Sequence, residues 1–399
     1  MDQSRSLRTV IVALSLILLS SVPISTVYAD IMQAFDGSPG WALNLMTVAP
    51  NLMNMAATAV SGLLLKRIPL RRLTLTAVTL LALGGILPIV DVGGLALVIF
   101  SRCLVGLCCG VLTPLVTVLA VGSFDASETD RIMGLRAAAQ AIGSMVMFLL
   151  TMVLVYGGWR WAFGIYFLAI PALAVVGRRM PAILIDHNHD EPLAGDGPVL
   201  PERGMWQIRF QVCVLTVAAF VYMVCLNTLA PSLSMFLAEE NIGAATLSGI
   251  GMCAYMLSGF VCGMCYQPIA AYAGRFTVFV GAAATSAGIA VIAVSHSLIP
   301  VFLGCALEGV GFAVFNSSGV LEASRGLEGA PKRRIVYLVL VAMGIGSFLS
   351  PFIADWLSAA LIGRSWMRGR FLVALYVSAG LSLLLFLYGV WACSASKKQ

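Results

Sequence analysis

The sequence has few charged residues for its length. Asp, Glu, Lys and Arg make up 11% of its 399 residues, whereas hydrophobic residues make up 60%. Soluble domains average roughly 25% charged residues. So little polar surface cannot cover a water-soluble globule of this size, which excludes a soluble enzyme and a soluble binding domain.

The sequence also lacks the groups that several kinds of chemistry need. No glycine-rich loop ends in Gly-Lys-Ser or Gly-Lys-Thr, which argues against ATP hydrolysis within the chain. Of the three histidines, His187 and His189 are too few ligands for a zinc site, and His296 stands alone. We therefore expect no cofactor, no metal and no enzymatic activity. A membrane-embedded acyltransferase would need histidines paired with acids, and this sequence does not show that spacing.

No cysteine lies outside the hydrophobic runs, so the ten cysteines do not form an oxidised extracellular scaffold. Cys262 and Cys265 have the C-x-x-C spacing of redox and metal motifs. Because they lie beside Gly259 and Gly263 in one apolar run, we interpret them as small packing residues.

Long hydrophobic runs are what the sequence has in abundance. A membrane-spanning helix needs about 20 mostly apolar residues. Twelve runs fit this length: 7–31, 42–65, 73–90, 94–121, 132–156, 160–177, 208–233, 246–270, 275–295, 298–321, 334–358 and 370–393. They predict an all-α, polytopic membrane protein with twelve transmembrane helices, for which the lipid bilayer is the natural partner.

The basic residues orient these spans. With both termini in the cytoplasm, nineteen of the 24 Lys and Arg residues fall on the cytoplasmic side. This positive-inside bias explains the net charge of +6 without a nucleic-acid partner. The exception to this bias is the cluster of basic residues at 364–370, which falls on the outer side of the membrane. The first run also resembles a cleavable signal peptide, because Arg5 and Arg8 precede an apolar core and "VYA". An uncleaved first span is preferred, since cleavage would leave eleven.

The chain divides into two repeated halves. A long polar stretch predicts a cytoplasmic linker at 181–207 between two six-helix bundles, 1–180 and 208–399. "LVGLCCGV" aligns with "LEGVGFAV", which matches Gly106 with Gly309, and "AIGSMVMF" aligns with "GIGSFLSP", which matches Gly143 with Gly346. Repeated six-span halves are a transporter architecture.

Several motifs resemble those of the major facilitator superfamily, and the likeness covers essentially the whole chain. Arg102, Gly106 and Gly110 resemble the signature of its fourth span. "GGWRWAFGIY" is similar to the start of its sixth span, and "GIGSFLSPF" to its eleventh. The resemblance implies two pseudo-symmetric six-helix bundles that transport a small molecule by alternating access, with spans one, four, seven and ten lining a central cavity.

The loop after the second span only partly follows the family pattern. Gly62, Leu64 and Arg67 match, but Lys66 replaces an aspartate that normally helps to latch the two halves. We take Gly62, Lys66, Arg67 and Arg71 as the candidate gating loop.

The fifth span bears on the direction of transport. Drug–proton antiporters of the family carry Gly-Pro there, whereas this chain has Met147 and Phe148. "ETDRIMGLRAAAQAIG" nevertheless resembles bacterial twelve-span efflux permeases of the arabinose- and drug-exporter type. This resemblance implies a monomer in the bacterial inner membrane.

Two charges lie deep within predicted spans, where charged groups are costly and usually functional. Glu308 lies about 15 Å into its span and Arg102 about 12 Å, from the helical rise per residue. Glu308 can exchange a proton or pair with a cationic substrate, or it can be structural. Arg102 can hold an anionic substrate, or it can donate to carbonyls of the first span near Pro23.

Uncharged polar residues complete the candidate site. Asn51 and Asn54 lie three residues apart and so share a helix face, and Gln140 and Tyr222 are also deep. Each can bind a ligand or simply join helices.

The sequence thus predicts a secondary transporter that exports a small organic molecule in exchange for protons, with the proton gradient as its energy source. Uptake by proton symport or facilitated diffusion is the alternative. A membrane-embedded enzyme and a sensor that has lost transport are more remote.

Overall fold

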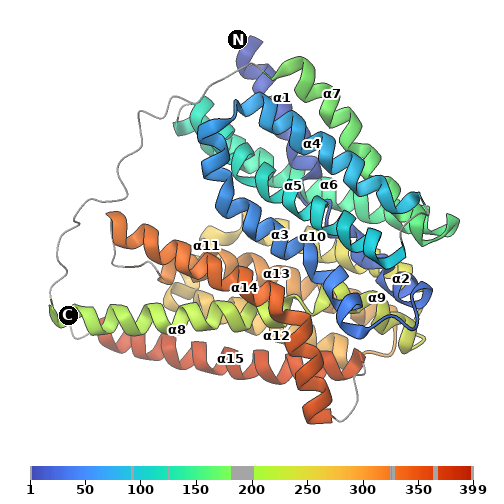
Figure 1. Ribbon diagram of the computed structural model, residues 1–399. Helices are drawn as coiled ribbons and strands as arrows, with labels where there is room; N and C mark the ends of the chain where they lie inside the picture. Colours follow the sequence, from blue (N-terminus) through green and yellow to red (C-terminus); the bar gives the residue numbers. More distant parts are fainter. Residues whose placement is uncertain are drawn as a thin grey trace. The chain divides into compact units, whose positions relative to one another are not determined.

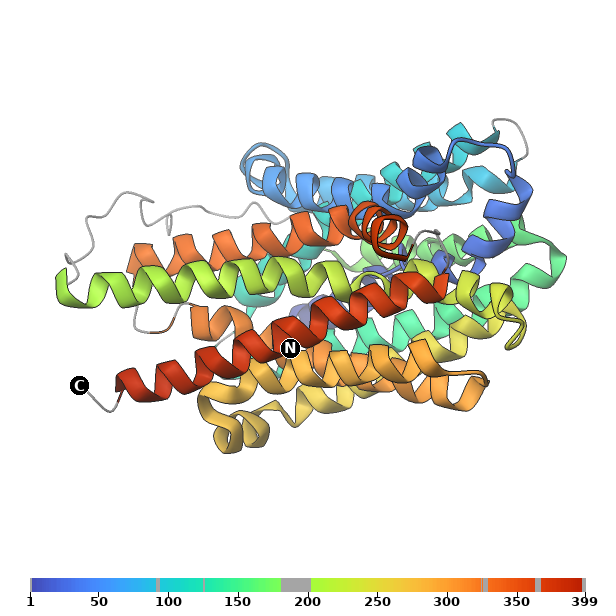
Figure 2. The same cartoon turned by 90° about the horizontal axis from the view of Figure 1, so that it is seen from below.

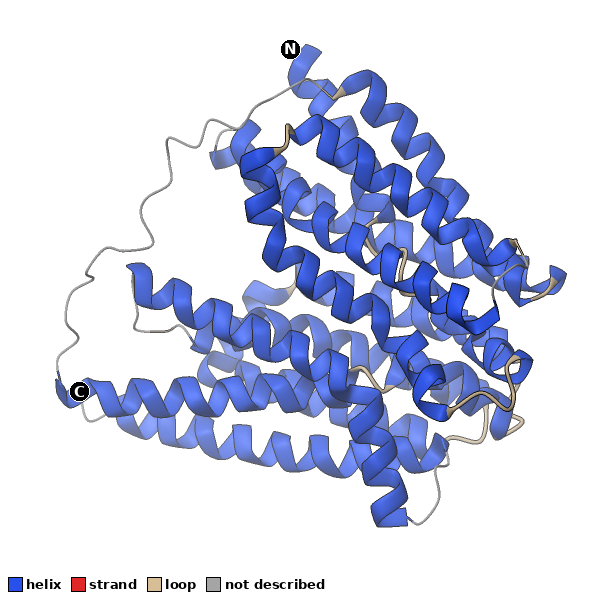
Figure 3. Cartoon of the chain, viewed as in Figure 1, coloured by secondary structure: helices blue, strands red, loops and turns tan. Residues whose placement is uncertain are grey.

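The computed structural model describes residues 2–90, 94–124, 126–180, 202–323, 325, 329–362 and 367–396. In these ranges the regular structure is helical and contains no strand, and Figure 3 shows helices joined by short loops and turns. The chain forms two compact units, one of Met1–His189 with Leu233–Cys253 and the other of Asp190–Ser232 with Ala254–Gln399. The domain limits 1–180, 181–207 and 208–399 remain predictions, because most of the linker lies outside the described residues.

The first unit contains helices α1 to α7 (Figure 1). Its α-helices are α1 (Asp2–Ile17), α2 (Tyr28–Ala34), α3 (Gly40–Arg67), α4 (Leu70–Ile86), α5 (Gly94–Ser123), α6 (Ala126–Leu154) and α7 (Ala169–Arg179). Short 3-10 segments extend them: η1 (Pro23–Val27), η2 (Leu87–Ile89), η3 (Val155–Gly157) and η4 (Trp159–Leu168). The first predicted span is therefore a broken helix, because α1 ends at Ile17 and a turn precedes η1 and α2.

The second unit is built mainly from the later helices. They are α8 (Glu202–Leu226), α9 (Leu229–Glu239), η5 (Ala245–Leu247), α10 (Ser248–Met264), α11 (Tyr266–Ala273), η6 (Gly274–Phe276), α12 (Thr277–Val294), α13 (Leu298–Ala323), α14 (Gly329–Ile362) and α15 (Met367–Ser396). Of these, most of α9, all of η5 and the start of α10 lie in 233–253 and belong to the first unit. Figures 1 and 2 show α8 and α15 running side by side. Helix α14 changes direction partway along and contains Pro351, a usual cause of kinks.

Nine helical segments of the described residues are long and apolar enough to cross a membrane. Each of the twelve predicted runs is mostly helical, but 7–31, 42–65 and 246–270 are not among the nine. The run 7–31 is interrupted after α1, and the run 246–270 is divided between α10 and α11. The chain is an all-α, multi-pass membrane protein, and the number twelve remains a prediction.

The cluster at 364–370, which departs from the positive-inside pattern, is partly engaged in side-chain contacts. Arg370 forms an ion pair with Asp355 on α14, and its side chain is largely buried. Arg368 donates to the carbonyl of Ser295 at 3.1 Å. These contacts tie the start of α15 to α14 and to the end of α12.

Glycines allow helices to approach closely at equivalent places in the two units. In the first unit, a Cβ added at Gly106 of α5 would overlap the backbone of Pro50 in α3. In the second unit, a Cβ added at Gly309 of α13 would overlap the backbone of Tyr255 in α10. The two glycines matched by the sequence repeat therefore make the same kind of contact, and small residues are the usual means of helix association in lipid.

The second pair of matched glycines repeats this behaviour. A Cβ at Gly143 of α6 would overlap the backbone of Leu16 in α1, and one at Gly346 of α14 would overlap the backbone of Phe220 in α8. Helix α6 therefore packs closely on α1, the first helix of its unit. In the same way, α14 packs closely on α8, the first long helix of the second unit. The packing supports the internal repeat inferred from the sequence.

Arg102 stabilises the break in the first predicted span. Its Nη2 donates to the carbonyl of Ser21 at 2.6 Å and to the hydroxyl of Tyr28 at 3.0 Å, and its Nη1 donates to the hydroxyl of Tyr166 at 3.3 Å. Tyr166 in turn donates to the carbonyl of Ser20 at 3.1 Å. The guanidinium is 2% exposed, so two carbonyls of the break are satisfied without water.

We expect Gly143→Ala to lower stability by about 1–3 kcal/mol, because its methyl group would meet backbone that no rotamer change can clear. Gly134→Ala in the same helix is the control, since an added Cβ there has nothing within 4 Å. Thermal unfolding in detergent, followed with a dye that reacts with newly exposed cysteine thiols, measures both. Equal unfolding temperatures for the two variants would contradict the close approach.

We expect Arg102→Ala to destabilise the first unit, because each buried carbonyl left unpaired costs about 1–3 kcal/mol. Arg102→Lys keeps the charge but loses the planar fork of donors, so we expect an intermediate loss. Arg67→Ala removes an exposed charge and is the control. The same unfolding assay applies, and an Arg102→Ala variant as stable as Arg67→Ala would show that the break needs no donor.

Candidate functional site

Glu308 is the most unusual side chain of the second unit. It lies on α13 and is 0% exposed, and neither of its carboxylate oxygens has a hydrogen-bond partner among the described residues. A Cβ added at Gly288 of α12 would lie 2.8 Å from its Cγ, so only glycine leaves room for it there. A buried charge is costly unless it is paired. In this arrangement no described group offsets the cost of a charge on this carboxyl.

Aromatic and hydroxyl side chains surround Glu308. The hydroxyl groups of Tyr222 and Thr285 are 2.8 Å apart, which joins α8 to α12. The ring of Tyr222 stacks on Phe315 with centroids 3.7 Å apart and an angle of 9°. Tyr222 and Tyr255 lie within electrostatic range of the Glu308 carboxyl. The structure thus brings together two of the predicted site residues, Glu308 and Tyr222.

Close helix packing holds this cluster in place. The hydroxyl of Ser258 on α10 donates to the carbonyl of Ala306 on α13 at 2.7 Å, and Gly309 lies against Tyr255. Cys225 and Cys305 also lie within electrostatic range of Glu308. Helices α8, α10, α12 and α13 therefore all contribute to the wall around the carboxyl.

Arg102 belongs to the first unit and has a different environment. Both of its terminal nitrogens donate to groups of that unit, on Ser21, Tyr28 and Tyr166. Of its two interpretations, this geometry favours a donor that stabilises the broken first span.

The other predicted site residues of the first unit are less enclosed. On α3, Asn51 is exposed and Asn54 is half-buried, and Asn54 accepts a long hydrogen bond of 3.4 Å from Thr58. Gln140 on α6 is half-buried, and its backbone carbonyl accepts a bond from Ser144 at 2.8 Å. Their roles in ligand binding remain predictions.

The candidate gating loop shows one specific contact. Arg71, at the start of α4, donates to the carbonyl of Gly177 near the end of α7 at 2.7 Å. Gly62 and Arg67 are exposed, and the side chain of Lys66 lies outside the part of the chain that the structure describes. The loop is thus tied to its own unit through Arg71.

The sequence reasoning missed a second break, in the predicted span 208–233. Helix α8 ends at Leu226 and α9 begins at Leu229. At this break Asn227 donates to the carbonyl of Met223 at 3.0 Å and to the hydroxyl of Ser347 at 3.0 Å, while Ser350 donates to the carbonyl of Val224 at 2.6 Å. The sequence does carry a signal for this break, the proline of "NTLAP". Pro231 lacks the N–H that would donate to the carbonyl of Asn227 in a continuous helix.

Tyr28 and Tyr166, which bind Arg102, were also missed. Nothing in their spacing connects them with Arg102 along the chain. The two breaks lie in the first predicted span of each half, and interrupted spans at corresponding positions point to transporter binding sites.

Comparisons with known proteins agree with this architecture. The family model described as Major Facilitator Superfamily matches residues 9–321. A search of curated protein sequences finds no significant match.

Solved structures of transporters share the fold at low sequence identity. The nucleoside transporter NupG is 12% identical, with a TM-score of 0.77 over 97% of this chain and 99% of that one. A bacterial homologue of the human lysosomal transporter Spinster is 11% identical, with a TM-score of 0.71 over 97% of each chain. The POT family transporter PepTSo is 13% identical, with a TM-score of 0.70 over 99% of each. Because the family model spans most of the sequence, the chain belongs to the major facilitator superfamily and is a secondary transporter rather than an enzyme.

Proposed function

We propose that this transporter exports a small organic molecule in exchange for protons, and that Glu308 carries the proton. The observation that supports this proposal is the Glu308 carboxyl, which is fully buried with neither oxygen hydrogen-bonded in the described structure. A structural carboxyl would normally bind donors of neighbouring helices. A carboxyl that takes up and releases a proton needs no permanent partner.

The charges also bear on the substrate. The terminal nitrogens of Arg102 already bind acceptors of its own unit, so of the two charges deep in the predicted spans Glu308 is the one with no hydrogen bond in the described structure. A carboxylate favours a cation. We therefore place lipophilic organic cations first among the substrates, before sugars and organic anions.

Uptake by proton symport or facilitated diffusion is the second candidate. The absence of Gly-Pro at Met147 and Phe148 favours it, as does the fold shared with a protein named as a nucleoside transporter. Nucleosides therefore belong in the substrate panel.

We place the protein as a monomer in the bacterial inner membrane with both termini in the cytoplasm, driven by the proton gradient and without a cofactor. The distribution of basic residues supports this orientation. A sensor without transport would bind a compound from the panel and produce no flux.

The direct test uses inside-out membrane vesicles with an acidified interior and a pH-sensitive dye. We expect at least one cation of the panel to release protons from the vesicles and to accumulate inside. Glu308→Gln, which keeps the size of the side chain but cannot carry a proton as an acid, should abolish this proton release.

Asp36→Asn is the matched control, because it removes an exposed carboxylate outside the helices and should leave proton release unchanged. Wild-type behaviour of Glu308→Gln would show that Glu308 is structural. Equilibration of a substrate irrespective of the imposed gradient would identify a facilitator, and proton movement in the same direction as the substrate would identify a symporter.

A further inference from the structure

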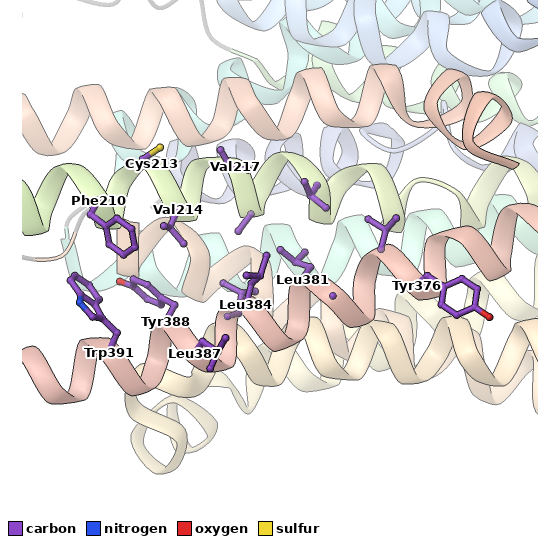
Figure 4. Close-up of a pocket in the computed structure, with 15 residues that line it drawn as sticks. Phe210, Cys213, Val214, Val217, Tyr376, Leu381, Leu384, Leu387, Tyr388 and Trp391 are labelled. Atoms are coloured by element: carbon purple, nitrogen blue, oxygen red, sulfur yellow. The ribbon is translucent and has the colours of Figure 1, made fainter. Parts of the chain in front are cut away.

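An apolar groove runs along the second unit between α8 and α15. It has a volume of about 740 Å³, within the usual range of ligand pockets. Figure 4 shows its lining side chains, with Phe210, Tyr388 and Trp391 at one end and Tyr376 at the other. Its walls are almost entirely hydrocarbon, from residues such as Val214, Val217, Leu381 and Leu384.

The sequence builds this groove from two helical stripes. On α8, Phe210, Val214, Val217 and Val221 recur at intervals of three and four residues and so lie on one face. On α15, Gly380 contributes no side chain, and a Cβ added there would meet nothing within 4 Å. The two helices therefore leave an open space along part of their length.

One end of the groove has the chemistry of a membrane–water interface. Phe210 and Trp391 pack edge to face with centroids 4.9 Å apart, and Tyr388 lies next to Trp391 at 5.9 Å. Trp and Tyr are enriched where a membrane meets water. The hydroxyl of Tyr388 is buried and has no hydrogen-bond partner among the described residues, although the residue lines the groove.

Charged and polar groups gather at the same end. Arg275 donates to the carbonyl of Ala392 at 2.7 Å, Arg325 pairs with Glu322 at 2.8 Å, and Gln211 donates to the carbonyl of Glu322 at 2.5 Å.

The exposed Arg209 directly precedes Phe210 at this end.

The groove is long enough to span half of a bilayer. From the helical rise per residue, it follows α8 for about 16 Å from Phe210 to Val221 and α15 for about 22 Å from Tyr376 to Trp391. One leaflet of the hydrocarbon core is about 15 Å thick. A chain that enters at the aromatic end would therefore reach the middle of the membrane.

We propose that this groove binds one acyl chain of a membrane phospholipid, with the phosphate near Arg209 and the ester region near Tyr388. The lipid fills the space between α8 and α15 and so joins the two helices. A polar substrate would find few groups to orient it along the apolar walls, whereas an acyl chain needs none.

Native mass spectrometry of the full chain tests this proposal. The protein is extracted in mild detergent, supplied with phosphatidylglycerol and phosphatidylcholine, and stripped by detergent exchange. We expect wild type to retain one phospholipid, with phosphatidylglycerol preferred. Gly380→Phe places a ring in the groove and should lose the lipid.

Gly263→Phe is the matched control, because Gly263 is also an exposed helical glycine with open space around it but lies outside the groove. It should retain the lipid. If Gly380→Phe fails to fold, Val217→Trp fills the same groove, and Val261→Trp on α10 is its control. Arg209→Gln should keep a lipid but lose the preference for phosphatidylglycerol.

Three results would overturn the proposal. They are a wild-type protein that retains no phospholipid, equal retention by Gly380→Phe and Gly263→Phe, and retention of a compound with a mass other than that of a phospholipid. An Arg209→Gln variant with an unchanged lipid preference would overturn the placement of the phosphate.

Discussion

The need to hydrogen-bond every backbone polar group away from water shapes this protein. Within hydrocarbon, a helix can be interrupted only where other protein groups satisfy the freed carbonyls. The first unit meets this need with Arg102, whose two nitrogens bind Ser21, Tyr28 and Tyr166. The second unit meets it with the side-chain amide of Asn227, which donates to the carbonyl of Met223, and the hydroxyl of Ser350, which donates to that of Val224. One half therefore uses a charge and the other uses neutral groups for the same task.

This difference explains why the two embedded charges are not equivalent. The terminal nitrogens of Arg102 donate to three acceptors, which offsets the cost of burying the charge. Glu308 has no such partners among the described residues, and Gly288 of α12 lies close against its Cγ. A charge that organises the backbone and a carboxyl that is left without donors are suited to different work.

Much of the architecture could be predicted from the sequence. Hydropathy located the helices, and the glycine pair Gly143 and Gly346 marked equivalent packing sites, because helix period and residue size are local properties. The partners of Arg102 could not be predicted, since they depend on helix rotation and tilt, which packing sets. Hydropathy also placed 7–31 and 208–233 as continuous runs, because it does not detect a backbone break between apolar residues.

The glycine at position 288 has a consequence for the kinetics of transport. By allowing α12 to lie directly against the stem of Glu308, it leaves the carboxyl with no exposed surface. In the proposed mechanism, a carboxyl with no exposed surface can exchange its proton only after the surrounding helices separate. The frequency of that separation would then set an upper limit on the turnover rate, however steep the proton gradient.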